Sequence, residues 1–245
     1  MSETGLSKST PRLFVDTPLA ADALVTLPAP ASHYLGSVMR LGEGDAVKLF
    51  DDRSGEWLGR IEGGTRKALG VRLVDHLRAR ETVPDLWLCV APLKRGRIDW
   101  VAEKACELGV ARLVPVITAR TIVDKLNLDR LRAHMVEAAE QCGRTALPEV
   151  VEPLSLAALL RDWPAGRALI FADEDGGAPL AETLRACPAP CAILIGPEGG
   201  FTDAERAAIR ALPAARAVTL GPRILRADTA AAVAVGVWQA VVGDG

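Results

Sequence analysis

The sequence lacks any apolar run of the roughly 20 residues that a membrane-spanning helix needs. It also lacks an apolar signal segment near its start, because residues 1–10 are polar and are expected to form a disordered start. The five cysteines are an odd number in a chain of 245 residues, so they do not indicate a disulfide framework. We therefore expect a protein without membrane segments, reduced and cytoplasmic.

Patterns typical of metal and nucleotide sites are also missing. Cys187 and Cys191 are close in sequence, but no second Cys or His pair has a matching spacing. We therefore expect small buried thiols there and no metal. The three histidines lie far apart with no nucleophile motif nearby. Neither the dinucleotide fingerprint nor the phosphate-binding loop with its lysine is present.

The composition excludes disorder, because 49% of the residues are hydrophobic. A net charge of −2 excludes a chain that is basic throughout. Charge is uneven, however: residues 86–120 carry six basic groups against three acidic ones. Such a local basic face can bind phosphates, although for Lys94, Arg95 and Arg97 the residues alone favour a solvated loop. The basic residues are Lys94, Arg95, Arg97, Lys104, Arg112 and Arg120.

Two regions differ in their pattern. Residues 11–80 contain short β-rich runs separated by turn signals, which predict a small β-barrel domain interrupted by a short helix near 32–40. Residues 81–85, with Pro84, are the expected linker. From residue 86 to 245, strands alternate with helices, which predicts a parallel sheet with helices on both faces. The expected strands and helices there include 86–91, 112–117, 128–142, 168–172, 180–186 and 229–242.

The most informative segment is Ile193–Thr202, where an apolar strand runs into a Gly-rich loop. Thr202 and Glu205 then match a capping box at a helix start. A second strand, at 217–220, runs into the loop 221–226, and a helix follows that we expect Asp228 or Thr229 to cap. Because ligands bind at the carboxyl ends of strands in open α/β sheets, the two loops predict a pocket, although a sharp turn is the alternative for the first.

Several motifs lie along nearly the whole chain in a specific order and spacing: Leu93–Arg97, Glu103–Val110, Pro115–Val116, Arg120, Glu140–Arg144, Pro148, Leu194–Gly200 and Leu220–Arg226. Together these motifs resemble the RsmE family of ribosomal RNA uridine-N3 methyltransferases, in the SPOUT class of α/β-knotted enzymes. This chain has Ala227-Asp228-Thr229 where the family usually has Thr-Glu-Thr, so its carboxylate is one methylene shorter.

The resemblance implies a PUA-like RNA-binding barrel over 11–80 and a SPOUT methyltransferase domain over 86–245, with a trefoil-knotted sheet. It implies a homodimer that packs through the last helix, and 16S rRNA, within the small ribosomal subunit, as the partner. S-adenosylmethionine is the implied cofactor. The residues implied to bind it are Leu194, Ile195, Gly196, Pro197, Glu198, Gly199, Leu220, Gly221, Ile224 and Leu225.

The same resemblance implies roles in catalysis and RNA binding. The target is a uridine near the 3′ end of 16S rRNA, in the decoding region. As a hypothesis, Arg226 stabilises negative charge on the uracil carbonyls, and Asp228 orients Arg226 or accepts the proton. The expected RNA-binding residues are Lys94, Arg95, Arg97, Arg120, Gln141 and Arg144.

Three alternatives stay open at this point. One is a methyltransferase of the same class that acts on another RNA, such as tRNA. Another is a non-catalytic RNA-binding factor in ribosome assembly that keeps the fold. The third, which ignores the resemblance, is a nucleotide-binding α/β enzyme that uses helix N-termini for phosphate. The absence of a phosphate-loop lysine counts against the third.

Overall fold

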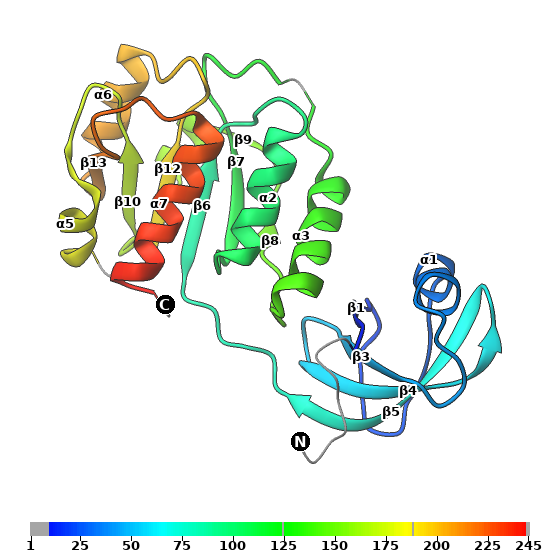
Figure 1. The fold of residues 1–245 in the computed structure, drawn as a ribbon. Helices are drawn as coiled ribbons and strands as arrows, with labels where there is room; N and C mark the ends of the chain where they lie inside the picture. Colours follow the sequence, from blue (N-terminus) through cyan, green and yellow to red (C-terminus); the bar gives the residue numbers. More distant parts are fainter. Residues whose placement is uncertain (1–9, 124, 188, 244–245) are drawn as a thin grey trace. The chain divides into compact units, whose positions relative to one another are not determined.

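The computed structural model describes residues 10–123, 125–187 and 189–243, and they form two compact units (Figure 1). The first contains the described chain up to Thr82 together with Ala139–Ala146, and the second contains Val83–Ala138 and the described chain from Leu147 onward. Apart from Thr10, the disordered start expected for residues 1–10 lies outside the described residues.

The N-terminal unit is a mixed five-stranded sheet in the order β1-β3-β4-β5-β2. The β1 and β3 strands are parallel, and the remaining neighbours are antiparallel. A short helix and one π-helical turn replace the helix expected near 32–40, and the short strand β2 is additional to the predicted ones. The elements are β1 (Arg12–Phe14), β2 (Leu24–Thr26), α1 (Ala29–His33), η1 (Tyr34–Val38), β3 (Ala46–Phe50), β4 (Glu56–Thr65) and β5 (Ala68–Arg78).

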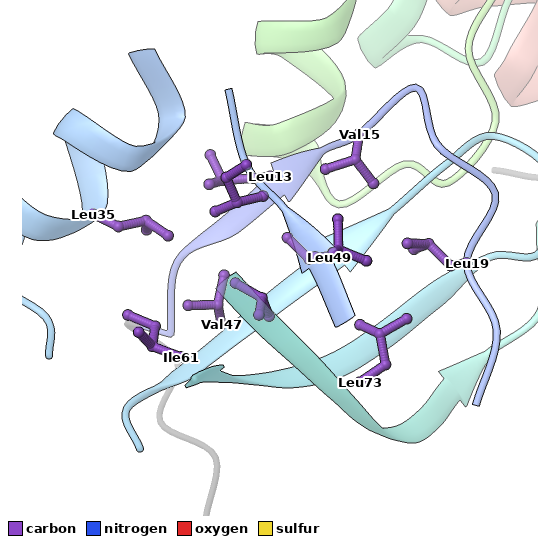
Figure 2. Close-up of a cluster of buried hydrophobic side chains, with 11 residues drawn as sticks. Leu13, Val15, Leu19, Leu35, Val47, Leu49, Ile61 and Leu73 are labelled. Atoms are coloured by element: carbon purple, nitrogen blue, oxygen red, sulfur yellow. The ribbon is translucent and has the colours of Figure 1, made fainter. Parts of the chain in front are cut away.

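Alternating apolar residues of these strands build the core of the N-terminal unit. Val47 and Leu49 of β3 and Leu73 of β5 are fully buried, as expected for one face of a pleated strand. Figure 2 shows their side chains converging with Leu13, Leu35 and Ile61. The sheet and the helical turn therefore enclose one continuous apolar cluster.

The segment Ala139–Ala146 is held to the N-terminal unit by hydrogen bonds. Arg12 donates to the carbonyls of Ala139 and Arg144, at 2.5 and 2.7 Å. Glu81 Oε1 accepts the backbone N–H groups of Thr145 and Ala146, both at 2.9 Å. The predicted linker at 81–85 gave no indication of this return of the chain.

The C-terminal unit is an eight-stranded sheet in the order β11-β13-β10-β12-β6-β7-β8, with β9 paired to β7. Every described pairing in it is parallel, as the alternation of strands and helices predicts. The elements are β6 (Leu86–Val90), α2 (Arg97–Glu107), β7 (Arg112–Ile117), α3 (Leu128–Cys142), β8 (Glu149–Val150), β9 (Leu154–Ser155), α4 (Leu156–Arg161), β10 (Ala168–Ala172), β11 (Ala178–Pro179), α5 (Leu180–Arg185), β12 (Cys191–Ile195), α6 (Asp203–Ala211), β13 (Ala215–Thr219) and α7 (Ala227–Val241).

Helices cover both faces of this sheet (Figure 1). On one face α7 packs against β6 and β12 and contacts α2 and α5. On the other, Leu156, Leu159 and Ile209 of α4 and α6 pack with buried residues of β10 and β12. The helices α2 and α3 are followed by Gly109 and Gly143 at positive φ (+76° and +86°), as predicted for helix C-termini. None of the described helices combines the length and the apolar composition that crossing a membrane requires.

Candidate active site

Three loops meet where three adjacent strands of the C-terminal unit end. Since β10 lies between β12 and β13 in a parallel sheet, the loops that follow these strands lie side by side. They enclose a cavity of about 310 Å³. This is the position at which open α/β sheets bind ligands, and both loops singled out in the sequence line it.

The Gly-rich loop 196–201 forms one wall and depends on its glycines. Gly200 has φ +68°, and an added Cβ there would collide with Glu174 Oε1. An added Cβ at Gly196 would lie 3.0 Å from the ring of Phe201, which is buried and packs edge-on to Phe171. The predicted capping box is confirmed: Thr202 accepts from Glu205 N at 3.2 Å, and Glu205 Oε2 accepts from Thr202 N at 2.9 Å.

The segment 220–226 forms the opposite wall and has no helical or strand structure. Gly221 (φ +113°) donates its N–H to Thr219 Oγ1 at 3.2 Å, which turns the chain after β13. Ile224 is 89% exposed although it is apolar, and it lines the cavity. An exposed isoleucine beside a cavity is typical of a surface that a ligand covers.

The start of α7 differs from the prediction. Its N-cap is Arg226, with extended backbone (φ −65°, ψ 151°) and no capping bond from its side chain. The predicted cap by Asp228 or Thr229 is therefore wrong, because the helix already begins at Ala227. Asp228 Oδ1 instead accepts the N–H of Thr229 at 2.9 Å, within the first turn. The Arg226 side chain is exposed and lines the cavity.

A third wall, the acidic loop Asp173–Asp175 after β10, was not identified from the sequence. Asp173 and Glu174 line the cavity together with Arg206 of α6. The sequence does contain a signal for this wall, since three consecutive carboxylates follow the buried strand 168–172 directly. Ligands bind at the carboxyl ends of parallel strands, and this holds for the loop after 168–172 as it does for the other two loops.

Arg206 connects the acidic loop to α6. Its Nε–H donates to Asp173 at 3.1 Å, and its other nitrogens lie 2.8 Å from Glu174 and 2.9 Å from Asp175. Desolvation opposes the charge of Arg206, but these carboxylates outweigh it and raise the pKa of the guanidinium. Arg210 adds a second cation, 2.6 Å from Asp173. The four carboxylates around Arg206, including Asp203, leave this wall with an excess of negative charge over Arg206 and Arg210.

The structure brings together most residues predicted to bind a cofactor. The cavity is lined by Ile195, Gly196, Pro197, Glu198, Leu220, Gly221, Ile224 and Leu225. Two of the predicted residues do not line it. Leu194 is fully buried in the core beneath the loop, because alternate residues of β12 point to opposite faces of the sheet. Gly199 packs against Arg120 on the outer side of the loop.

Some of the basic residues at the start of α2 are exposed and can contact an anionic partner. Lys94 and Arg95 are exposed, and Arg97 is half-buried at the first turn of α2. Gly96 is the N-cap with φ +87°, and its N–H donates to Asp99 Oδ2 at 3.1 Å. The short turn and its cap therefore present Lys94 and Arg95 to solvent.

The other three residues predicted to bind RNA have different surroundings. Gln141 is exposed at the end of α3. Arg144 is 6% exposed, and its Nε lies 3.5 Å from Glu81 of the same unit, so this side chain is buried. Arg120 contacts the Gly-rich loop through the carbonyls of Gly199 and Phe201.

The thiols and acidic groups form no metal site in the parts of the chain that the structure describes. Cys191 is fully buried, and burial raises the pKa of its thiol to about 12. Burial also raises the pKa of Cys89 to about 12. Such thiols stay protonated and act as small apolar side chains, as expected for Cys191 from its sequence context. Cys187, which was also expected to be buried, is only half-buried.

Comparison with known protein families gives two matches. Residues 80–239 match the model of an RNA methyltransferase domain, and residues 27–74 match that of an RNA methyltransferase PUA domain. Among curated proteins, the ribosomal RNA small subunit methyltransferase E of a Synechocystis species is 31% identical over 91% of this chain and 75% of its own length. The protein of that name from Rickettsia conorii is 28% identical over 91% of this chain and 93% of its own.

Solved structures give the same result. A putative methyltransferase from Legionella pneumophila, in complex with S-adenosylmethionine, has a TM-score of 0.84 at 30% identity, over 96% of this chain and 99% of its own. A ribosomal RNA small subunit methyltransferase E from Neisseria gonorrhoeae, bound to the same compound, has a TM-score of 0.86 at 26% identity, over 95% and 98%. With its two matched domains, the chain belongs to the RNA methyltransferase family that includes ribosomal RNA small subunit methyltransferase E.

Proposed function

We propose that this protein methylates N3 of a uridine near the 3′ end of 16S rRNA, in the decoding region, with S-adenosylmethionine as the methyl donor. The observation that carries the proposal is the cavity at the ends of β10, β12 and β13, lined by the Gly-rich loop and by 220–226. The two relatives with solved donor complexes share the fold of the whole chain. The methylation takes place in the cytoplasm, where the small ribosomal subunit is assembled.

The residues around the cavity fit the chemistry of this donor. Ile195, Leu220 and Leu225 supply apolar surface for a flat adenine ring. Gly196 and Gly221 line the cavity and carry no side chain, so a ligand can approach the main chain closely there. The negative wall formed by Asp173–Asp175 suits a ligand that carries a sulfonium and an ammonium group.

When bound, S-adenosylmethionine supplies an electrophilic methyl group that needs in-line positioning but no further activation. The protein must therefore act on the other reactant, because uracil N3 carries a proton at neutral pH and is a poor nucleophile. Arg226 is exposed at the cavity, where its positively charged guanidinium can donate hydrogen bonds. It therefore stabilises negative charge as it develops on a uracil carbonyl. The positive end of the α7 dipole lies at the same place and acts in the same sense.

Asp228 stands two residues after Arg226, in the first turn of α7. Its carboxylate either orients the guanidinium of Arg226 or accepts the uracil proton, directly or through water. Lys94, Arg95, Arg97 and Gln141 are the residues proposed to contact RNA, and the N-terminal unit assists them. The proposal includes the threaded knot and a homodimer packed through α7, both of which the family resemblance implies.

The test is methyl transfer to small-subunit RNA. Purified protein is incubated with labelled S-adenosylmethionine and either 30S subunits or free 16S rRNA from cells that lack the modification, and the product is digested and mapped. N3 lies on the pairing edge of uracil, so its methylation stops reverse transcription at one position near the 3′ end. Methylation of tRNA only would favour another RNA target. Donor binding without transfer to any RNA would favour an assembly factor.

A further inference from the structure

The middle of the Gly-rich loop makes few contacts of its own. Glu198 and Gly199 are exposed, and within the loop Gly200 N–H donates to the carbonyl of Pro197 at 2.9 Å. The strand β12 and the helix α6 fix the two ends of the loop, but they do not fix its centre. Because the inner side of this loop lines the cavity, its position determines the shape of the donor pocket.

Arg120 supplies the missing contact from the outer side. Its Nη1 donates to the carbonyl of Gly199 at 2.5 Å and to that of Phe201 at 3.4 Å. Its aliphatic part packs where a side chain at residue 199 would be, since an added Cβ at Gly199 would lie 3.3 Å from Arg120 Cδ. One side chain thus fixes the backbone on both sides of Gly200, the residue with positive φ.

Arg120 is itself held in place by a short turn after β7. Thr121 N–H donates to the carbonyl of Thr118 at 3.1 Å, and Thr118 N–H donates to Thr121 Oγ1 at 2.9 Å. The neighbouring Ala119 N–H donates to Glu205 Oε1 at 2.7 Å, so the turn is tied to the start of α6.

Glu205 joins this turn to the end of the loop. Its other oxygen accepts from Thr202 N–H at 2.9 Å. Desolvation would raise the pKa of Glu205, but the hydrogen bonds from Thr202 and Ala119 and the charge of Arg120 hold it below its usual range. The carboxylate is therefore ionised at neutral pH, and its two hydrogen bonds link Ala119 of the turn to Thr202 at the end of the loop.

We propose that Arg120 is a positioning residue of the donor pocket and not a contact for RNA. It does not line the cavity, so it acts on the donor only through the loop that it holds. The proposal rests on the proposed function, because it assigns a role at the same pocket. The physical basis is conformational. The donor binds only while the loop is in its binding-competent position, so the apparent affinity falls in proportion to the fraction of time that the loop spends there.

The experiment measures two affinities for four proteins. Wild type, Arg120→Ala, Arg120→Lys and the control Arg185→Ala are titrated with S-adenosylhomocysteine by calorimetry and with a 16S rRNA fragment by fluorescence anisotropy. Arg185 is an exposed arginine on α5, so its substitution controls for the loss of one surface charge.

We expect Arg120→Ala to weaken S-adenosylhomocysteine about tenfold, as it would if the loop were competent about a tenth of the time. RNA affinity should match that of Arg185→Ala. Arg120→Lys should be intermediate, since a lysine reaches one carbonyl but has no planar fork. Hydrogen exchange of the amides in 196–201 should be faster in Arg120→Ala than in wild type, which a role in RNA binding would not produce.

Two results would overturn the inference while leaving the proposed function intact. One is weaker RNA binding by Arg120→Ala with unchanged S-adenosylhomocysteine affinity. The other is unchanged affinity for both ligands. If Arg120→Ala proves unstable, the lysine variant decides between the same outcomes. Failure of the wild type to bind S-adenosylhomocysteine would instead overturn the proposed function, and this inference with it.

Discussion

The carboxylate of Asp173 is fully buried and lies between two arginines of α6, 3.1 Å from Arg206 Nε and 2.6 Å from Arg210 Nη2. Its backbone N–H also donates to Val218 of β13 at 3.0 Å. Asp173 therefore connects β10, β13 and α6 at the edge of the cavity, and it keeps the acidic loop in place.

Asp173 and Asp203 both contact Arg206, but we predict that removing the two carboxylates has unequal effects on stability. Asp173→Asn should lower the free energy of unfolding by about 2 kcal/mol, because it weakens charged hydrogen bonds in a buried setting. Asp203 also contacts Arg206, at 3.3 Å, but is fully exposed. Asp203→Asn should therefore leave stability unchanged. Urea unfolding of the two variants measures the difference, and equal effects would show that burial of Asp173 contributes nothing.

Gly200 and Gly63 give a matched pair for the Gly-rich loop. Both have φ +68°, but an added Cβ at Gly63 meets nothing within 4 Å, whereas at Gly200 it displaces Glu174. Each alanine should cost about 1 kcal/mol of stability through the left-handed backbone. Only Gly200→Ala should weaken S-adenosylhomocysteine binding, because only this change moves a wall of the cavity. Calorimetry on both variants checks this; equal binding by the two would mean that Glu174 and the loop backbone do not shape the pocket.

Glu56 predicts a pH dependence of stability in the N-terminal unit. Burial would raise the pKa of this carboxyl, but hydrogen bonds and charges from Arg12 and Arg78 outweigh it and hold the pKa below its usual range. A lowered pKa in the folded state means that the stabilisation is present above the unfolded-state pKa and is lost as the pH falls through the folded-state value. Glu56→Gln should cost about 3 kcal/mol at pH 7, since it leaves arginine charge uncompensated beside a buried site.

The measurement is unfolding by urea from pH 7 to pH 3 for wild type and Glu56→Gln. The two curves should converge in acid, where wild-type Glu56 becomes protonated. Glu62 pairs with Arg72 at 2.6 Å on the exposed side of the same strands, so Glu62→Gln is the control and should follow wild type throughout. A constant gap between wild type and Glu56→Gln at every pH would contradict the assignment.

Arg226 should matter for transfer and not for donor binding. Arg226→Ala should reduce the rate of methyl transfer about 100-fold or more, the typical cost of removing one preorganised donor to a developing anion. S-adenosylhomocysteine affinity should change less than threefold, about 0.6 kcal/mol. Single-turnover kinetics and calorimetry give the two numbers. Equal losses in both would indicate that Arg226 only supports the segment 220–226.

Two substitutions of Asp228 distinguish whether the charge of its carboxylate or the length of its side chain matters for the reaction. Asp228→Asn removes the carboxylate and should lower the rate strongly, whereas Asp228→Glu restores the residue usual in the resembled family and should keep or raise it. The pH–rate profile is the readout, since a proton acceptor contributes an acidic limb that vanishes in Asp228→Asn. A profile unchanged in both variants would remove Asp228 from the proton path.

The sequence was most informative where local rules apply. The helix Leu128–Cys142 and the strand Ala168–Ala172 have the predicted bounds, because apolar spacing and a following glycine or turn determine them locally. The capping box at Thr202 was readable for the same reason. Both predicted loops line one cavity because strand order places β10 between β12 and β13, and that order is not written in any one segment.

Long-range pairings explain what the sequence did not reveal. Arg144 was predicted to contact RNA from its motif, but it is buried and lies beside Glu81, which is 63 positions away in the chain. Arg120 was expected to bind RNA from the family resemblance, and this stays untested; the carbonyls that its Nη1 contacts lie about 80 residues downstream. The sequence alone does not show which carbonyl or carboxylate groups an arginine contacts, because the fold brings these distant partners to it.

The proposed function requires that the cavity formed by 196–201 and 220–226 binds S-adenosylmethionine. Calorimetric titration with S-adenosylhomocysteine, with ATP and NADH as controls, tests it most directly. We expect saturable binding at about one site per chain for S-adenosylhomocysteine and none for the two controls. Binding of ATP or NADH in its place, or no binding by the folded protein, would contradict it.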